Sequence, residues 1–380
     1  MIGAFESMVR RHPQRTCFTC VDETGEARAY SYRETRMLSA ALARHLRRRG
    51  VNPGDSVAVD LPNCAAYVFL VLAAAYGGFS LVALNNRLTG GEKLGRLMEI
   101  ERKPGVNVAL RVDEAAVGRL VDEAVALLAG EAEVGGGSRD PLDPRDSWGY
   151  RDSRGSRAGL RSAGARPRRI SFTARESALA AEPRSTRGLG RASSGRASLR
   201  RRDEMARQDA VESVIHFAEH AAHVFDRGSR ALVMFTSGTT GRSKAVSLTW
   251  ENICSASEVS NAVLNRRGEG LWQAVLPFYH IGGFQVVVRS LLNGTPFILY
   301  RRFDAARVLS DAARRGATHI SVVDKMLQDL LSASAELSID AVRRYSCILL
   351  GGGAVKPRTL ERALSVGARV YARYGMTETS

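Results

Sequence analysis

One stretch of nine residues, 236–244, combines hydroxyl side chains, glycines and a final lysine directly after an apolar segment, 231–235. Glycines let a backbone approach an anion closely, and backbone N–H groups together with hydroxyls can then surround phosphate oxygens. The stretch differs from the common P-loop, because Lys244 stands three residues after Gly241 and no hydroxyl residue follows it. The pattern predicts a phosphate-binding loop rather than a surface turn, formed by Thr236, Ser237, Gly238, Thr239, Thr240, Gly241 and Lys244.

A second candidate group lies near the C-terminus, where an aromatic residue is followed closely by a hydroxyl and a carboxylate. The flat ring of Tyr374 is suited to stacking on a purine, and Thr377 is suited to hydrogen bonding a phosphate oxygen. Glu378 offers the hard oxygen ligand that Mg²⁺ prefers. Taken singly, these residues have ordinary alternatives, a core aromatic or a solvated charge. Taken together with the loop, they indicate nucleotide chemistry.

Histidines give weaker signals. His280 lies in an apolar stretch, where a histidine is more often a hydrogen-bonded core residue than a catalytic group. His216, His220 and His223 share one face of a predicted helix at a spacing that metal sites also use. That helix borders an irregular segment, and we do not expect a metal there.

The elements that must position these residues alternate between short apolar strands and amphipathic helices, which predicts an α/β fold with mostly parallel sheets. Predicted strands cover 56–59, 79–84, 106–110, 231–235, 271–276, 297–300, 319–323, 346–350 and 369–371. Predicted helices cover 32–49, 65–76, 92–101, 304–315 and 355–364. We expect two packed α/β subdomains, 1–135 and 205–380, separated by an insertion at 136–204.

The insertion accounts for most of the formal net charge of +16, because its run 138–202 contains 17 arginines, no lysine and six acidic residues. Its apolar residues are sparse and lack a period, so burial cannot offset the entropy of ordering, and we predict disorder. A nucleic-acid-binding protein would use such a charged segment. The run contains no recognisable binding module, and we therefore expect no nucleic-acid partner.

Composition restricts the class of protein further. A hydrophobic share of 44% excludes global disorder. Five cysteines are too few for a disulfide scaffold, and the lone C-x-x-C of Cys17 and Cys20 indicates strand residues, so we expect a cytoplasmic protein. The uncharged stretch 61–86 is long enough to cross a membrane, but Gly77 and Gly78 divide it into a helix and a strand. We predict no membrane span.

The run 235–244 resembles the signature loop of the adenylate-forming enzymes, the acyl-CoA synthetase superfamily, with Ser243 replacing a proline and Ala245 a glycine. Three further stretches resemble that superfamily in its own order: 277–283, 349–354 and 373–378. Within the superfamily, the chain most resembles the o-succinylbenzoate–CoA ligases of menaquinone biosynthesis.

This resemblance implies the large N-terminal domain of a ligase that uses ATP, Mg²⁺ and coenzyme A to activate a small-molecule carboxylate through an acyl-adenylate. The implied catalytic residues are Lys244, His280, Thr377 and Glu378, and the implied metal ligands are Glu378 and Thr236. The implied nucleotide-binding residues are the loop residues above together with Gly351, Gly352, Gly353, Ala354, Tyr374, Gly375, Met376 and Thr377. Substrate contacts are implied for His280, Ser321 and Gly352.

In the superfamily, the large domain continues past the position of Glu378 and a small C-terminal domain follows. We therefore expect a truncated ligase with impaired activity, which a separate C-terminal domain would complete, and a homo-oligomer is compatible with the sequence. The alternatives are a nucleotide-binding remnant without catalysis and a ligase for another aryl or acyl carboxylate.

Overall fold

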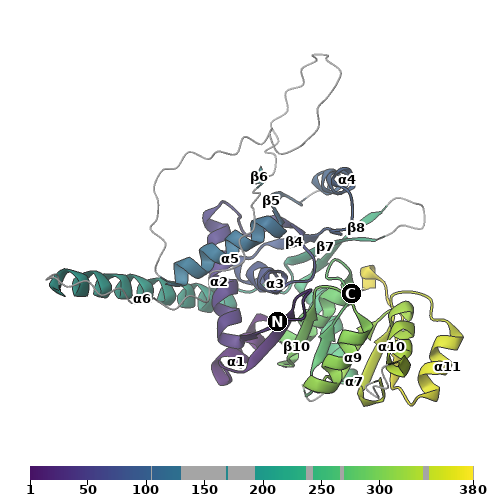
Figure 1. Cartoon of the computed structure of the whole chain (residues 1–380). Coiled ribbons are helices and arrows are strands. Elements are labelled where there is room, and N and C mark those ends of the chain that lie inside the picture. The colour runs from purple at the N-terminus through teal and green to yellow at the C-terminus, as the bar shows by residue number, and fades with distance from the viewer. Residues whose placement is uncertain are drawn as a thin grey trace.

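The computed structural model describes residues 1–103, 105–129, 168–169, 193–236, 243–265, 269–336 and 342–379, which form two β-sheets surrounded by helices (Figure 1). The strands are β1 (Thr16–Val21), β2 (Ala27–Ser31), β3 (Ser56–Asp60), β4 (Ser80–Ala83), β5 (Val108–Asp113), β6 (Arg168–Arg169), β7 (Arg230–Thr236), β8 (Lys244–Thr249), β9 (Trp272–Ala274), β10 (Phe297–Tyr300), β11 (His319–Val322), β12 (Cys347–Leu350) and β13 (Val370–Ala372). The α-helices are α1 (Ile2–Arg11), α2 (Tyr32–Arg48), α3 (Ala65–Gly77), α4 (Gly90–Glu101), α5 (Glu114–Ala129), α6 (Ser193–His223), α7 (Trp250–Leu264), α8 (Ile281–Asn293), α9 (Ala305–Arg315), α10 (Asp324–Glu336) and α11 (Pro357–Ser365). Two short 3-10 helices are η1 (Val342–Arg344) and η2 (Thr377–Thr379).

The two sheets are mostly parallel. The seven-stranded sheet has the order β13-β12-β11-β9-β10-β1-β2, and the six-stranded sheet has the order β6-β5-β3-β4-β7-β8. Among the described strands, the pairs β1–β2 and β7–β8 run antiparallel and the other neighbours run parallel. The α/β fold class predicted from the sequence is therefore confirmed. Strand β1 contains Cys17 and Cys20, in agreement with the strand interpretation of that pair.

Each sheet takes strands from both ends of the chain. Strand β1 pairs with β10, with Phe18 opposite Phe297, and β4 pairs with β7, with Leu81 opposite Leu232. The sequence pattern predicted one subdomain before the insertion and another after it. In the structure, each sheet instead combines strands from both sides of the insertion. Hydrophobic pattern identifies a strand, but its partner is set by packing between segments far apart in the sequence.

Most of the predicted insertion, 136–204, lies outside the described residues. Two described parts differ from the predicted disorder, because Arg168–Arg169 pair with β5 and α6 already begins at Ser193. Figure 1 shows α6 extending away from the body of the molecule. Its C-terminal half is anchored by buried side chains that include Val214 and Ala218. Once part of a helix is anchored, each further residue adds one hydrogen bond, and the Ala, Leu and Arg residues of 196–202 favour this propagation.

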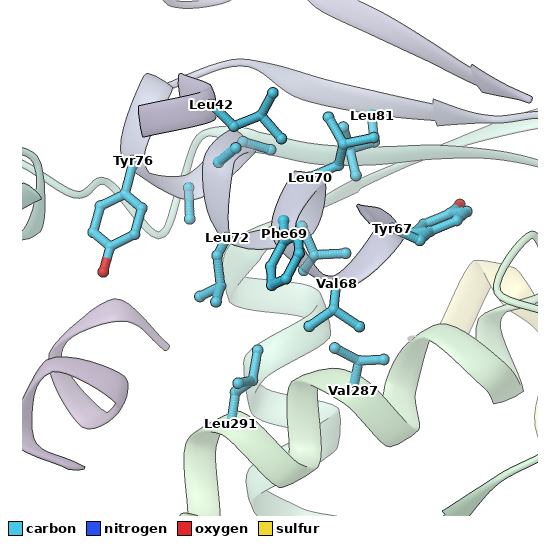
Figure 2. Packing of buried hydrophobic residues seen from close by; sticks show 14 of the residues in the cluster. Leu42, Tyr67, Val68, Phe69, Leu70, Leu72, Tyr76, Leu81, Val287 and Leu291 are labelled. Atoms are coloured by element: carbon cyan, nitrogen blue, oxygen red, sulfur yellow. The ribbon is translucent and has the colours of Figure 1, made fainter. Parts of the chain in front are cut away.

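Helix α3 lies at the centre of the largest hydrophobic core. Figure 2 shows Val68 and Leu72 of this helix facing Val287 and Leu291 of α8. The uncharged stretch 61–86 is thus a buried helix followed by a strand, as the sequence predicted. Within the described part of the chain, no helix combines the length and the apolar character needed to cross a membrane.

Helix α4 covers the six-stranded sheet where β7 and β8 lie. A capping box fixes its start, because the Thr89 hydroxyl accepts from the Glu92 N–H while the Glu92 carboxylate accepts from the Thr89 N–H. Leu97 and Ile100 then pack in a small core cluster with Val233 of β7 and with other strand residues. This helix is therefore firmly attached to the sheet that carries the predicted phosphate loop.

Candidate functional site

The predicted phosphate loop connects two antiparallel strands. Strand β7 ends at Thr236 and β8 begins at Lys244, and these two residues stand opposite each other in the register of the hairpin. Lys244 is exposed and Thr236 is half-buried. The intervening predicted residues, Ser237, Gly238, Thr239, Thr240 and Gly241, lie outside the described residues. The structure thus brings together the first and the last residue of the predicted loop.

A glycine-rich turn follows β12. Gly352 has a φ of +82°, a conformation that residues with side chains rarely adopt. A Cβ on Gly351 would lie 3.0 Å from the carbonyl oxygen of Arg373, which immediately follows β13. The absence of side chains lets this turn pass closely over the end of β13. Gly353 and Ala354, which complete the predicted segment, are exposed.

The segment after β13 carries the third predicted group. Tyr374 is 89% exposed, so the alternative that it is a core aromatic is wrong. Gly375, Met376 and Glu378 are also exposed, and Thr377 is half-buried. Helix η2, which contains Thr377 and Glu378, lies next to β8, the strand that begins at Lys244. Two motifs that are far apart in the sequence therefore meet at this strand.

A cavity of about 820 Å³ lies between one face of α7 and the C-terminal ends of β12 and β13. Its volume is in the range of small-molecule sites. Tyr374 and Glu378 line the cavity together with Ser260 of α7 and Leu349 of β12. Lys244, His280 and the glycines after β12 are outside its described lining. The cavity wall therefore contains residues of the predicted group after β13, whereas the described residues of the other predicted groups do not line it.

His280 immediately precedes α8. Its ring centroid lies 4.7 Å from that of Tyr279, and its backbone carbonyl accepts from the Phe284 N–H. Part of its side chain is open to solvent. The pKa of His280 is nevertheless lowered, first by desolvation from the surrounding protein and second by the positive charge of Arg87. A neutral imidazole, which can accept a hydrogen bond, is therefore favoured near neutral pH.

Two features fix the loop that leads to His280. The side-chain amide of Asn63 donates to the Leu276 carbonyl at 2.9 Å and accepts from the Phe278 N–H at 2.9 Å. A Cβ on Gly283 would lie 2.3 Å from the Pro277 carbonyl oxygen, so only glycine allows this close approach. Sequence reasoning did not find Asn63, because a single Asn after a strand carries no distinctive pattern.

An Asn63→Asp variant should be destabilised by about 2–3 kcal/mol, because a carboxylate cannot donate and would leave the Leu276 carbonyl without its partner. Urea unfolding measures this loss. Asn85→Asp is the matched control, since the described bond of Asn85 uses its side-chain oxygen as an acceptor, which Asp retains. Equal unfolding midpoints for the two variants would contradict the assigned role of Asn63.

Arg289, on α8, is a buried cation that sequence reasoning missed. It is only 2% exposed, and its Nη1 and Nη2 donate to the hydroxyls of Ser260 and Ser321 at 3.0 and 3.2 Å. Its guanidinium carbon lies 4.5 Å from the ring centre of Trp272. Among the described residues, no acidic side chain forms an ion pair with it, and its Nε has no hydrogen-bond partner. The one signal in the sequence is a single charge within the otherwise apolar helix.

The buried charge of Arg289 has no acidic partner among the described residues. Burial, followed by repulsion from Arg373, lowers the pKa of Arg289 to about 9. Burying a charge costs free energy unless the charge is paired. A buried cation without a nearby anion is therefore uncompensated. Ser260 lines the cavity, and Ser321 is one of the residues predicted to contact substrate. Arg289 is thus linked to the cavity through Ser260, although its own side chain is buried and is not part of the described lining.

The metal predictions differ in their fit. Mg²⁺ takes few carboxylates and keeps waters, so Glu378 and the hydroxyl of Thr236 form a suitable donor set for it. Among the described residues, no three His, Cys, Asp or Glu side chains cluster in a way that would hold a metal ion. His216 lies 3.9 Å from Glu219 on the exposed side of α6.

Comparison with known proteins gives a consistent family. The sequence profile described as AMP-binding enzyme matches residues 5–380. The chain is 38% identical over 148 residues to a 2-succinylbenzoate–CoA ligase of Bacillus anthracis (strain A0248), covering 39% of this chain and 30% of that protein. A 2-succinylbenzoate–CoA ligase of Bacillus cereus (strain Q1) is 39% identical over 149 residues, with the same coverage. The chain thus spans about 30% of the length of the curated relatives that it matches.

Solved structures share the fold. The O-succinylbenzoate coenzyme A synthetase from Bacillus subtilis in complex with AMP has a TM-score of 0.63 at 22% identity, covering 99% of this chain and 74% of that one. The inhibitor-bound N-terminal domain of FACL13 from Mycobacterium tuberculosis has a TM-score of 0.64 at 18% identity, covering 99% and 76%. At these identities the likeness concerns the fold.

Proposed function

The chain belongs to the AMP-binding enzyme family, and from this premise we propose that it is an ATP-dependent carboxylate–CoA ligase acting on 2-succinylbenzoate. The single observation that carries the choice of substrate is Arg289, a buried guanidinium that donates to Ser260 of the cavity wall and has no described acidic partner. The names of the Bacillus relatives support the same choice. The proposal includes Mg²⁺ and coenzyme A, and it includes a cytoplasmic location, which the five unpaired cysteines support.

A substrate with two carboxylates suits this site better than one with a single carboxylate. One carboxylate must reach the nucleotide to be activated, and it loses its negative charge when the adenylate forms. The second carboxylate stays charged through the whole reaction. Paired with Arg289, it would compensate the buried cation and use the unpartnered Nε. A monocarboxylate would leave Arg289 without a counter-charge throughout.

The nucleotide in this proposal lies between the hairpin and the segment after β13. Lys244 and Thr236 stand opposite each other at the end of the hairpin and would bind phosphate oxygens. Tyr374 is exposed on the cavity wall and would stack on the adenine. Thr377 and Glu378 lie beside β8 and would approach the α-phosphate. The glycine turn after β12 leaves room for a ligand because its residues carry no bulky side chain.

The proposed reaction has two steps. A carboxylate oxygen of the substrate attacks the α-phosphorus of ATP, and pyrophosphate leaves, which gives an acyl-adenylate. The sulfur of coenzyme A then attacks the acyl carbonyl, its proton is lost to solvent, and AMP leaves with the electron pair of the broken C–O bond. Mg²⁺, held by Glu378 and Thr236, would neutralise charge on the phosphates. Lys244 would stabilise the leaving pyrophosphate, and neutral His280 would orient the carboxylate.

A Lys244→Ala variant should bind MgATP about 10- to 100-fold more weakly, because it lacks a charge-assisted hydrogen bond to a phosphate. Isothermal titration calorimetry with MgATP measures the change. Lys325→Ala is the matched control, since Lys325 is an exposed lysine paired with Asp329 on α10. An affinity of the Lys244 variant equal to that of the control would contradict the loop assignment.

Activity is tested by pyrophosphate release in the presence of ATP, Mg²⁺ and 2-succinylbenzoate, with and without a C-terminal domain from a related ligase added in trans. We propose that the added domain raises turnover. Nucleotide binding without turnover under both conditions would favour a non-catalytic remnant. Turnover with another aryl carboxylate but none with 2-succinylbenzoate would overturn the proposed substrate.

A further inference from the structure

Helix α4 and the residues just after it contact one rung of the hairpin that carries the predicted phosphate loop. A rung here is one pair of residues that stand opposite each other on β7 and β8. The guanidinium carbon of Arg96 lies 5.0 Å from the ring centre of Phe235 on β7. The Nζ of Lys103, just beyond the end of α4, donates to the carbonyl oxygen of Ala245 on β8 at 2.5 Å. Phe235 and Ala245 are register partners. The two cations therefore contact the two residues of the same rung, Arg96 the one on β7 and Lys103 the one on β8.

The position of this rung matters. The next rung toward the loop pairs Thr236 with Lys244 and is the last one described before the loop. Strand β8 lies at the edge of the six-stranded sheet, so β7 is its one neighbouring strand in the described part of the chain. An edge strand that ends in a loop is free to fray or twist unless another element holds it. Helix α4 supplies that element one residue before the proposed phosphate ligands.

Both contacts come from α4 and the residues just after it. Arg96 lies within α4 and Lys103 lies two residues past its end at Glu101, and both side chains reach the hairpin. Between them, Leu97 and Ile100 pack in the core cluster that also contains Ala245. Apolar contacts thus attach the helix to the sheet, and the side chains of Arg96 and Lys103 contact the hairpin from it.

We propose that α4 is a positioning element of the phosphate site, acting through Arg96 on Phe235 and through Lys103 on Ala245. The inference rests on the proposed nucleotide binding. By holding the rung, the two side chains set Thr236 and Lys244 at a fixed separation before the anion arrives. Two ligand residues whose separation is already fixed lose less conformational entropy on binding, so the affinity for a triphosphate rises without any new contact.

A purely structural role gives a different expectation. In that case, loss of Arg96 or Lys103 would lower the unfolding temperature and leave nucleotide affinity unchanged. The buried Nη1 of Arg96 has no hydrogen-bond partner among the described residues, so its stacking on Phe235 is the contact to remove. The experiment must therefore separate a change at the hairpin from a change in global stability.

The variants are Arg96→Met, Lys103→Met and the double variant, each of which keeps an apolar stem while removing the cation. Met98→Ala is the matched control, because Met98 is exposed on the same helix. Calorimetry gives the affinities for MgATP and for AMP, and hydrogen exchange gives the protection of residues 230–249. Arg96→Lys and Lys103→Arg test rescue by a conserved charge, and Arg96→Gln and Lys103→Gln replace the Met variants if those fail to fold.

We expect MgATP to bind about fivefold more weakly to each Met variant, with AMP affinity unchanged because AMP lacks the outer phosphates. We expect faster exchange in β8, and partial recovery of both readouts with the conserved charge. If the parent chain binds neither nucleotide, the proposed function fails, and exchange in β8 alone decides whether α4 holds the hairpin. MgATP affinity and β8 exchange equal to those of the control would overturn the inference.

Discussion

An Arg289→Met variant is expected to bind 2-succinylbenzoate at least tenfold more weakly than the parent chain, and by about 100-fold if the ion pair is fully buried. Methionine fills much of the volume of the arginine stem but offers no donor to a carboxylate. MgATP binding should not change, because Arg289 contacts Ser260, Ser321 and Trp272 rather than the hairpin. The preference for two carboxylates should disappear with the charge.

The measurement compares 2-succinylbenzoate with benzoate, which has one carboxylate, by calorimetry in the presence of AMP. The parent chain should prefer the dicarboxylate, and the variant should bind the two compounds alike. Arg314→Met is the control, since Arg314 is a largely exposed arginine on α9. If the Arg289 variant retained the preference of the parent chain, the second carboxylate would have to bind elsewhere.

The pH dependence of stability gives a second readout of the same side chain. The folded pKa of Arg289 is about 9, well below the ordinary value that it has in the unfolded chain, because burial disfavours the charged form. Between these values the unfolded chain binds more protons than the folded chain, so this group makes stability rise with pH. Below pH 9 the buried charge costs stability. We therefore expect the Met variant to match or exceed the parent at pH 7, and this advantage to shrink above pH 9.

A Gly283→Ala variant should lose more than about 3 kcal/mol of stability. Its new Cβ would lie 2.3 Å from the Pro277 carbonyl oxygen and 2.6 Å from that of Leu276, and both are backbone atoms that cannot rotate away. Helix α8 or the preceding loop would have to move, and His280 lies between them. We expect the variant to lose affinity for the carboxylate as well as stability.

The neighbouring glycine supplies the control. A Cβ on Gly282 would meet the Leu276 side chain at 3.4 Å, which is an ordinary contact. Gly282→Ala should therefore change the free energy of unfolding by no more than about 1 kcal/mol. Urea unfolding of both variants, followed by carboxylate titration, measures the difference. Two variants of equal stability would contradict the close approach at Gly283.

Much of the fold could be predicted from local pattern. The burial of α3 followed from an apolar stretch interrupted by two glycines, and strand β10 was predicted at its observed bounds. Strand β8 was not predicted, because 244–249 follows directly on the loop residues and alternates only weakly. The interleaving of the sheets was also missed, since nothing local to β1 indicates that its partner is β10.

The candidate site divides in the same way. Tyr374, Thr377 and Glu378 could be proposed from residue type and order, because stacking, hydrogen bonding and metal binding need particular side chains. Arg289 could not, because its meaning comes from burial and from the absence of a described acidic neighbour. Asn63 acts only through a loop more than 200 positions away in the sequence. Such roles are properties of the packed molecule rather than of a motif.

The pairing of β1 with β10 also has a consequence for how the chain folds during its synthesis. Phe18 is synthesised long before its partner Phe297, because the two residues are far apart in the sequence. A hairpin of β1 and β2 without β10 would have one unpaired edge, and an isolated hairpin of this kind is marginal in water and prone to aggregation. The non-local pairing predicts slow folding, and it makes the nascent N-terminal segment a natural client for chaperones.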